Sequence, residues 1–257
     1  MKRVLHISDL HFGRIHPPAI ESLKSFLQNQ TTKFDLIIMT GDWTQRARAK
    51  QFKEAAQFIS ELKIPVITVP GNHDLPVYNI FARILQPLKN YREFIAPLTS
   101  DTFVDDELAV VGFRTATFSR TVEGTILKHD IKRARKIFEV ANPNALRIIA
   151  CHHPLMEPNK ETDIRPEYRV KQVLELKPHI IMSGHSHLNW IESVGKDGEH
   201  KIMHISAGSA VSNRLRGEVN SFHTIEIENK KVKIETYFLE PTGFITREKF
   251  AAQTLSY

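Results

Sequence analysis

The first two thirds of the chain alternate between short apolar runs and segments of helical periodicity. Apolar residues recur at helical spacing in residues 20–27, 52–62, 131–140 and 170–176. Uninterrupted apolar runs are typical of strands that are buried on both faces. The runs that we expect to form strands are residues 4–7, 36–39, 65–69, 108–113, 146–150 and 180–182. Strand and helix in repeated alternation predict an α/β protein with helices packed against a sheet.

The last third has a different pattern. Residues 201–205, 222–227 and 232–239 are expected to be antiparallel strands that complete the sheets. Apolar and polar residues alternate in the second and third of these segments, and Asn229-Lys230 forms a polar turn between them. The sequence shows no internal repeat, low-complexity tract or linker. We therefore predict a single domain over residues 1–257.

Residues 76–97 combine apolar, aromatic and basic side chains. The apolar ones include Tyr78, Phe81 and Leu85, and the pattern predicts a basic amphipathic helix, or a helix pair interrupted at Pro87. One interpretation is a helix that packs on the core. The other is a lid or substrate-recognition insert, suited to a ligand with an apolar part. The sequence leaves both interpretations open.

Composition places the chain among ordinary globular proteins. The 257 residues are 41% hydrophobic and 25% charged, and no segment approaches the roughly 20 apolar residues of a membrane-spanning helix. The basic N-terminus lacks a following apolar run, which argues against a secretory signal. Cys151 is the single cysteine, so no internal disulfide can form, and a reducing, cytoplasmic location is predicted.

The chain carries a net charge of +6. A basic protein favours anionic partners such as phosphate esters, nucleic acids or an acidic membrane face. The basic residues are spread along the chain, however, and a solvated basic surface explains the charge equally well. We therefore expect no stable nucleic-acid partner, while peripheral contact with a membrane stays open.

A metal-type ligand follows a small residue or glycine at the end of several expected strands. Glycine permits the sharp turns and close backbone approach that such positions need. Ligands in open α/β sheets gather beyond the carboxyl ends of the strands, so these side chains could converge. The segments are His6-Ile7-Ser8-Asp9-Leu10-His11, Met39-Thr40-Gly41-Asp42, Val69-Pro70-Gly71-Asn72-His73-Asp74, Ala150-Cys151-His152-His153-Pro154 and Met182-Ser183-Gly184-His185-Ser186-His187.

The donor atoms of these segments indicate which ions could bind. Carboxylate, amide and imidazole groups without a thiolate suit divalent Mn, Fe or Zn, and also Co or Ni. The candidate ligands are too many for one tetrahedral site, and they suit two ions about 3.5–4 Å apart that share a carboxylate. We therefore predict two divalent metal ions per chain. Their ligands would be Asp9, His11, Asp42, Asn72, His152, His185 and His187.

Each segment alone has an ordinary explanation, such as a turn or a buried histidine. Taken together and in this order, they resemble the signature of the calcineurin-like metallophosphoesterases. The matching blocks are Asp-x-His at residues 9–11, Gly-Asp at 41–42, Gly-Asn-His-Asp at 71–74, a histidine two residues before proline at 152, and Gly-His-x-His at 184–187. The resemblance spans about residues 3–210. It implies a four-layer α/β/β/α sandwich of two mixed sheets flanked by helices, with a dinuclear metal site.

The resemblance also implies individual roles. Asp9, His11 and His187 would hold one metal ion. Asn72, His152 and His185 would hold the other, and Asp42 would bridge the two. His73 would be a catalytic acid or a supporting residue, oriented by Asp74. No ligand of the family pattern is missing, which argues against the non-catalytic scaffolding members.

Other polar residues have weaker assignments. Arg214 and Arg216 follow the Ala207-Gly208-Ser209 turn and are candidate phosphate-binding residues together with Asn72 and His73, although a solvated loop is an equal explanation for the arginines. His153 is expected to be structural, with substrate contact as the alternative. The remaining histidines lack motif context and are expected to be structural or on the surface: His6, His16, His129, His179, His200, His204 and His223.

The substrate is the least determined feature. A compact chain with this signature resembles the bacterial cyclic-nucleotide phosphodiesterases, so we predict a small phosphodiester, best represented by 3′,5′-cyclic AMP. Alternatives of the same chemistry are a pyrophosphate hydrolase of the UDP-diacylglucosamine type and a nuclease. An alternative of another class is a scaffold that uses this fold without catalysis. The oligomeric state is not predicted.

Overall fold

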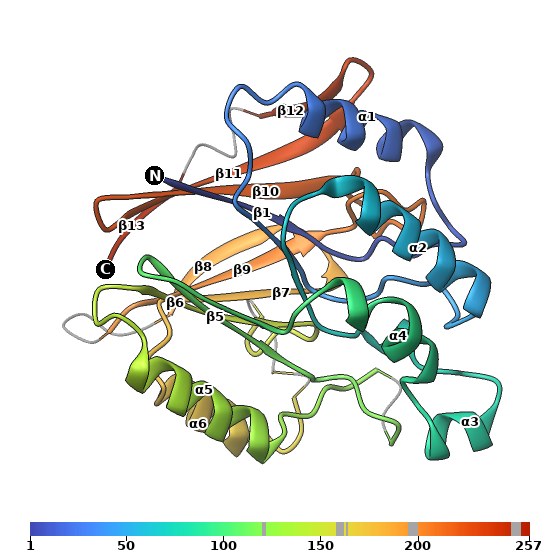
Figure 1. Ribbon diagram of the computed structural model, residues 1–257, viewed down its shortest axis with the longest axis horizontal. Helices are drawn as coiled ribbons and strands as arrows, with labels where there is room; N and C mark the ends of the chain where they lie inside the picture. The colour runs from blue at the N-terminus through green and yellow to red at the C-terminus, as the bar shows by residue number, and fades with distance from the viewer. Residues whose placement is uncertain (120–121, 158–161, 163, 195–199, 248–252) are drawn as a thin grey trace.

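Two β-sheets are stacked face to face, and helices cover their outer faces (Figure 1). The computed structural model describes residues 1–119, 122–157, 162, 164–194, 200–247 and 253–257. The first sheet has the strand order β12 (Gly243–Thr246), β11 (Lys231–Glu240), β10 (Ser221–Glu228), β1 (Lys2–Ile7), β2 (Leu36–Met39), β3 (Val66–Thr68), and β13 (Gln253–Ser256) also pairs with β11. The β1, β2 and β3 strands are parallel, whereas β10 to β13 pair antiparallel.

The second sheet has six strands. Their order is β4 (Thr102–Val104), β5 (Leu108–Phe113), β6 (Leu146–Cys151), β7 (Ile180–His187), β9 (Ile202–Gly208), β8 (Trp190–Val194). The four central strands are parallel, and β4 and β8 add antiparallel edges. Both sheets are therefore mixed, and the carboxyl ends of β1, β2, β3, β6 and β7 carry the segments with candidate ligands.

Helices lie on both sides of the stacked sheets. The first sheet is covered by α1 (Pro17–Gln28) and α2 (Ala49–Leu62), and the second by α5 (Lys128–Val140) and α6 (Tyr168–Leu174). Two short helices, α3 (Ile80–Leu85) and α4 (Lys89–Phe94), lie at one end of the molecule, next to α2. Short 3₁₀ turns occupy Asn72–Asp74 and Ala96–Leu98.

Three buried clusters fill the spaces between the four layers. Side chains of α1 and α2 pack on one face of the first sheet, and those of α5 and α6 pack on the outer face of the second. The third cluster, which includes Leu36, Ile38, Val110 and Ile148, lies between the sheets. In β2, Ile37 and Met39 point to the helices. Because both faces are covered, the strands need no polar alternation, and this explains the uninterrupted apolar runs of the sequence. The predicted four-layer sandwich is confirmed.

Several predicted details differ from the structure. Residues 201–205 were expected to be antiparallel, but β9 pairs parallel with β7 and antiparallel only with β8. The β7 strand continues to His187, with an irregularity between Ser183 and His187, so its ligand segment belongs to the strand. The sequence did not predict β4, β8, β12 or β13. These edge strands are short or mix polar and apolar residues, and such segments give a weak periodic signal.

The helix pair expected in residues 76–97 is present, with Pro87 between α3 and α4. Proline cannot continue a helix that needs its missing N–H group, which explains the break. Among the described helices, none has both the length and the apolar character required to cross a bilayer.

Candidate metal centre

The first group of candidate ligands is Asp9, His11, Asp42 and His187, all of which are buried. Asp9 and His11 follow β1, Asp42 follows β2, and His187 ends β7. Nε2 of His187 lies 3.2 Å from Nε2 of His11 and 3.2 Å from Oδ1 of Asp9. Nε2 of His11 lies 3.7 Å from Oδ2 of Asp42. Ligand atoms about 2.1 Å from one ion are about 3.0–3.4 Å apart, so this spacing is close to that of a shared cation.

Hydrogen bonding within this group also fits a cation. Nδ1 of the His187 ring donates to the carbonyl oxygen of Arg214 at 2.7 Å, which leaves Nε2 as the ring atom that could bind a metal. Oδ1 of Asp9 and Oδ2 of Asp42 are buried, and neither has a hydrogen-bond donor among the described residues. Buried carboxylate oxygens without a donor are costly unless a cation contacts them. These residues could therefore hold a divalent metal ion.

The second group lies on the other side of Asp42. Nε2 of His152 lies 3.0 Å from Oδ1 of Asn72, 3.3 Å from Nδ1 of His185 and 3.5 Å from Oδ1 of Asp42. Nδ1 of His185 is 3.2 Å from the same oxygen of Asn72. Nδ1 of His152 donates to the carbonyl oxygen of Thr40 at 2.8 Å, so its Nε2 again carries the lone pair. The two oxygens of Asp42 thus face different groups of ligands, as a bridging carboxylate would.

His153 lies closer to this second group than the sequence suggested. Its ring centroid is 4.5 Å from that of His185, and its ligand atoms lie within 4.8 Å of those of His152 and His185. Nδ1 of His153 lies 2.8 Å from Oγ1 of Thr115, and the Thr115 hydroxyl also lies 3.1 Å from the His153 backbone nitrogen. The ring is therefore fixed beside the candidate ligands. The doubled histidine before proline was the only sequence signal for it.

The backbone at the strand ends explains how the ligands converge. Left-handed backbone occurs at Asp9, His11, Asp42, His185 and His187, with φ between 48° and 69°. This region is uncommon outside glycine, although Asn, Asp and His enter it more readily than other residues. A side chain on Gly184 would lie 1.9 Å from Oγ of Ser8 and 2.5 Å from Oδ2 of Asp9. Glycine is required there because β7 and the Asp9 segment approach too closely for a Cβ atom.

Burial sets the charge state of the centre. Burial, together with the carboxylates of Asp9 and Asp74, raises the pKa of Asp42 well above its usual range. Burial lowers the pKa of His152 to about 4 and also lowers that of His11. The imidazoles of His11 and His152 are therefore neutral at pH 7, which is the state that binds metals. A bound cation would favour the ionised form of the Asp9 and Asp42 carboxylates and so offset the cost of burying their charge.

His73 and Asp74 have different hydrogen-bond partners among the described residues. Nδ1 of His73 donates to the carbonyl oxygen of Gln45 at 2.9 Å, and Nε2 accepts from Arg214 Nη1 at 2.7 Å. Asp74 instead accepts hydrogen bonds from backbone N–H groups of Trp43, Thr44 and Gly71, at 3.2, 2.9 and 3.0 Å. Its carboxylate thus joins the loop after Asp42 to the loop that carries Asn72 and His73. No pattern in the sequence indicated the role of the Gln45 carbonyl.

The ring of His73 is neutral in this arrangement. Burial and the neighbouring His11 and Arg214 lower the pKa of His73 to about 3. Arg214 contacts the centre twice, since its carbonyl oxygen accepts from His187 and its guanidinium donates to His73. The structure therefore places Arg214 beside a candidate ligand and the candidate acid.

A hollow of about 280 Å³, here called the metal pocket, joins these residues. It is lined by both groups of ligands and by residues that the sequence did not single out. Val77, Arg83 and Val122 lie on one part of its wall, and Arg214 and Arg216 on another. The full lining is Asp42, Asn72, His73, Val77, Arg83, Val122, His185, His187, Arg214 and Arg216. A phosphate placed here would meet ligands, arginines and apolar side chains together.

Comparison with known families agrees with this geometry. The family model of the calcineurin-like phosphoesterases matches residues 2–189. The chain belongs to this family. Calcineurin-like phosphoesterases are metal-dependent hydrolases of phosphoesters, and the matched region contains all seven predicted ligands of this member.

Two curated relatives illustrate the range of this family. The 3′,5′-cyclic adenosine monophosphate phosphodiesterase CpdA of Escherichia coli strain K12 is 32% identical over 81 residues, which are 28% of this chain and 30% of CpdA. The chain thus matches less than a third of the length of CpdA. The UDP-2,3-diacylglucosamine hydrolase of Histophilus somni is 23% identical over 206 residues, covering 73% of this chain and 85% of that enzyme.

Among solved structures, the fold resembles Vacuolar Protein Sorting 29 from Cryptosporidium parvum. The TM-score is 0.52 at 16% identity, and the match covers 100% of this chain and 98% of the other. A likeness at this identity concerns the fold alone. The two-sheet architecture therefore does not decide between catalysis and scaffolding, and the side chains of the site must do so.

Proposed function

We propose that this calcineurin-like phosphoesterase hydrolyses a phosphodiester with two divalent metal ions, of which Mn, Fe and Zn suit the oxygen and nitrogen donors. The observation that carries the proposal is the position of Asp42, whose two carboxylate oxygens face the imidazoles of His11 and His152 separately. A carboxylate so placed suits two ions a few ångströms apart. Cyclic AMP is the simplest candidate substrate and the first to test.

Divalent ions held by these ligands would supply an activated water and positive charge to offset the negative charge that develops on the phosphate oxygens. The protein contributes the remaining functions. Arg214 and Arg216 line the metal pocket and would bind non-bridging phosphate oxygens. Asn72 and His73 line the same pocket and would orient the phosphate. Nε2 of His73 is the ring atom directed at Arg214. Once phosphate draws the guanidinium away, Nε2 would take up a proton from water and pass it to the leaving oxygen.

Asp74 has a supporting role in this proposal. It fixes the loops that present Asp42 and Asn72 through hydrogen bonds to their backbone, and so acts on catalysis through their positions. A cytoplasmic location remains a prediction from the single cysteine, and cell fractionation tests it.

Scaffolding is the second candidate function, favoured by the likeness of the fold to Vacuolar Protein Sorting 29. A scaffold needs no orphaned carboxylate oxygens, and keeping Oδ1 of Asp9 and Oδ2 of Asp42 buried without donors would only destabilise it. Hydrolysis of bis-p-nitrophenyl phosphate with added Mn²⁺, Fe²⁺, Zn²⁺, Co²⁺ or Ni²⁺ separates the two. Turnover supports an enzyme, and its absence with every metal supports a scaffold.

Ligand substitutions test the centre itself. We expect His185→Ala and Asn72→Ala to reduce turnover at least about 100-fold and to lower metal content. Loss of a group that only supports a metal ligand already costs about 10–100-fold in activity, and loss of the ligand itself should cost more. His129→Ala, an exposed histidine on α5, is the matched control and should retain activity. Full activity of both ligand variants with metal still bound would contradict the proposal. Cyclic AMP, a nucleotide-sugar lipid and single-stranded DNA then distinguish the substrate classes.

A further inference from the structure

The α3 helix has the opposite polarity to an ordinary surface helix. Its buried side chain is Arg83, which is 4% exposed, whereas Phe81 and Leu85 are each 75% exposed. Ile80 and Ile84 are also more than half exposed. Single apolar side chains in water need no explanation, but several on one short helix indicate a contact surface.

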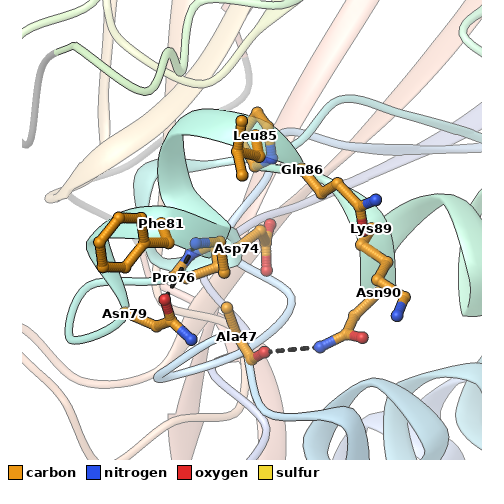
Figure 2. Close-up of a pocket in the computed structure, with 11 residues that line it drawn as sticks. Ala47, Asp74, Pro76, Asn79, Phe81, Leu85, Gln86, Lys89 and Asn90 are labelled. Atoms are coloured by element: carbon orange, nitrogen blue, oxygen red, sulfur yellow. Dashed lines mark hydrogen bonds between the residues drawn. The ribbon is translucent and has the colours of Figure 1, made fainter.

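Phe81 and Leu85 line a groove of about 400 Å³, here called the apolar groove. Figure 2 shows both side chains on α3, with Ala47 and Asn90 on the opposite rim. Pro76, Ala82 and Pro87 contribute further hydrocarbon surface.

Three of the polar side chains that line the apolar groove form hydrogen bonds within the protein, and Gln86 and Lys89 also contribute to its lining. The Asn90 side-chain amide donates to the carbonyl oxygen of Ala47 at 2.9 Å, and Oδ1 of Asn79 accepts from the backbone of Ala82 at 2.9 Å (Figure 2). Asp74, which reaches the groove, is 1% exposed and accepts from the loops described above. The surface left for a ligand is therefore mainly apolar.

The apolar groove and the metal pocket are separated by one short segment. Asp74 and Pro76 line the groove, whereas their neighbours His73 and Val77 line the metal pocket. Val77 is 49% and Tyr78 77% exposed on the ridge between the two hollows. A chain attached to a phosphate in the pocket would cross this ridge to reach the groove.

The metal pocket is rich in positive charge, whereas the apolar groove has little charge. The metal pocket carries Arg214 and Arg216 besides the candidate ligands, which suits an anionic phosphate. Lys89 is the cationic residue of the groove lining, at its α4 end. An anionic head with an apolar tail would thus find complementary surfaces on the two sides of the ridge.

We propose that the apolar groove binds the hydrocarbon chain of an amphiphilic phosphodiester whose phosphate lies in the metal pocket, an assignment that rests on the proposed function. It favours a substrate with an alkyl or acyl chain over cyclic AMP. It also assigns residues 76–87 as the recognition insert, while α4 packs on the core through Tyr91.

Binding of dodecyl phosphate, compared with inorganic phosphate on the Mn²⁺-loaded protein, tests this proposal by calorimetry. A buried methylene group contributes roughly a fourfold gain in affinity, so we expect dodecyl phosphate to bind at least about tenfold more tightly than phosphate. In the double variant Phe81→Asn/Leu85→Asn the two affinities should become equal within about threefold, with phosphate binding unchanged. Both side chains are exposed, so the variant should fold. Val140→Asn, at an 83% exposed position on α5, is the matched control and should keep the gain.

Several outcomes would overturn the proposal. These are equal affinity for both phosphates in the wild type, a gain that survives in the double variant, or a gain that Val140→Asn also loses. A wild-type dimer that the double variant abolishes would assign the surface to a second copy instead, and adsorption to phosphatidylglycerol vesicles without binding of monomeric dodecyl phosphate would assign it to a bilayer. Turnover of bis-p-nitrophenyl phosphate is measured separately, so failure of the catalytic proposal is distinguishable from failure of this one.

Discussion

The α2 and α3 helices place their apolar residues in opposite ways. In α2, Phe52, Ala55, Phe58 and Ile59 are buried against the first sheet, and the polar residues face solvent. In α3, Arg83 is buried and the apolar side chains face outward. The first arrangement stabilises the fold by removing apolar surface from water. The second arrangement leaves apolar surface in water and does not stabilise the fold in this way. We therefore attribute the exposed apolar residues of α3 to contact with a ligand.

Arg83 shows what holds α3 in place. Its guanidinium donates to the carbonyl oxygens of Pro76 and Phe118 at 3.0 and 2.9 Å, and to that of Thr117 at 3.5 Å. The helix is therefore anchored by hydrogen bonds from one buried cation. Because hydrogen bonds hold α3 in place, its apolar side chains stay exposed and available to a ligand. If apolar packing held the helix, those side chains would be buried.

The largest effect should come from the conventional helix. Phe52→Ala removes a fully buried ring from the core under α2, and we expect the free energy of unfolding to fall by about 3–5 kcal/mol. Urea denaturation followed by circular dichroism measures it. If the free energy of unfolding fell by less than about 1 kcal/mol, α2 and α3 would not differ in how their apolar residues stabilise the fold.

Acid stability should depend on the core and not on α3. Burial lowers the pKa of His223 to about 4, so the unfolded chain binds a proton near pH 6.5 that the folded chain does not bind until about pH 4. The free energy of unfolding should therefore fall as the pH decreases from 6.5 to 4, by at most about 1.4 kcal/mol per pH unit for this residue. In metal-free protein, His223→Gln should make the slope shallower, while Phe81→Asn should leave it unchanged. Equal slopes in wild type and His223→Gln would contradict this assignment.

An intermediate effect is expected for the anchor of α3. Arg83→Met keeps the length of the side chain but removes its hydrogen bonds to three carbonyl groups, and we expect a loss of about 1–3 kcal/mol. Because the damage is local, limited proteolysis should cut residues 76–87 faster in this variant than in wild type. Arg92→Met on α4 is the control. Unchanged proteolysis would show that the backbone of α3 is held by other contacts.

The smallest effect should come from the exposed face. Phe81→Ala should change the free energy of unfolding by less than about 0.5 kcal/mol, since the ring is 75% exposed. Thermal denaturation of both alanine variants, at Phe52 and at Phe81, gives the comparison directly. A loss of 2 kcal/mol or more at Phe81 would mean that its ring supports the fold, and would weaken the case for a ligand.

Much of this molecule could be predicted from the pattern of residues. Apolar runs covered on both faces indicated the parallel strands of both sheets, and the order of ligand types after strand ends indicated the family. Each strand and each ligand segment is recognised from a few adjacent residues, whereas the family is recognised from the order of the segments along the chain. The strand β9 was expected to be antiparallel because its neighbour β8 gave too weak a signal to reveal the crossover from β7.

The features that the sequence did not predict depend on contacts between residues far apart in the chain. The orientation of His73 depends on the carbonyl oxygen of Gln45 and the guanidinium of Arg214, which lies 141 residues away in the chain. Helical periodicity marked the apolar positions of residues 76–97 but did not say which face would turn inward. That choice depends on carbonyl groups at Thr117 and Phe118, and no local pattern records them.

The left-handed backbone at Asp9, His11, Asp42, His185 and His187 restricts how this centre can be redesigned. Asn is the replacement that such positions accept most readily. β-Branched residues would strain the backbone of the turn, whatever their effect on metal coordination. Attempts to alter metal preference should therefore begin at Asn72 and His152, whose backbone is not left-handed. Thiolate ligands introduced there would leave the five constrained turns intact.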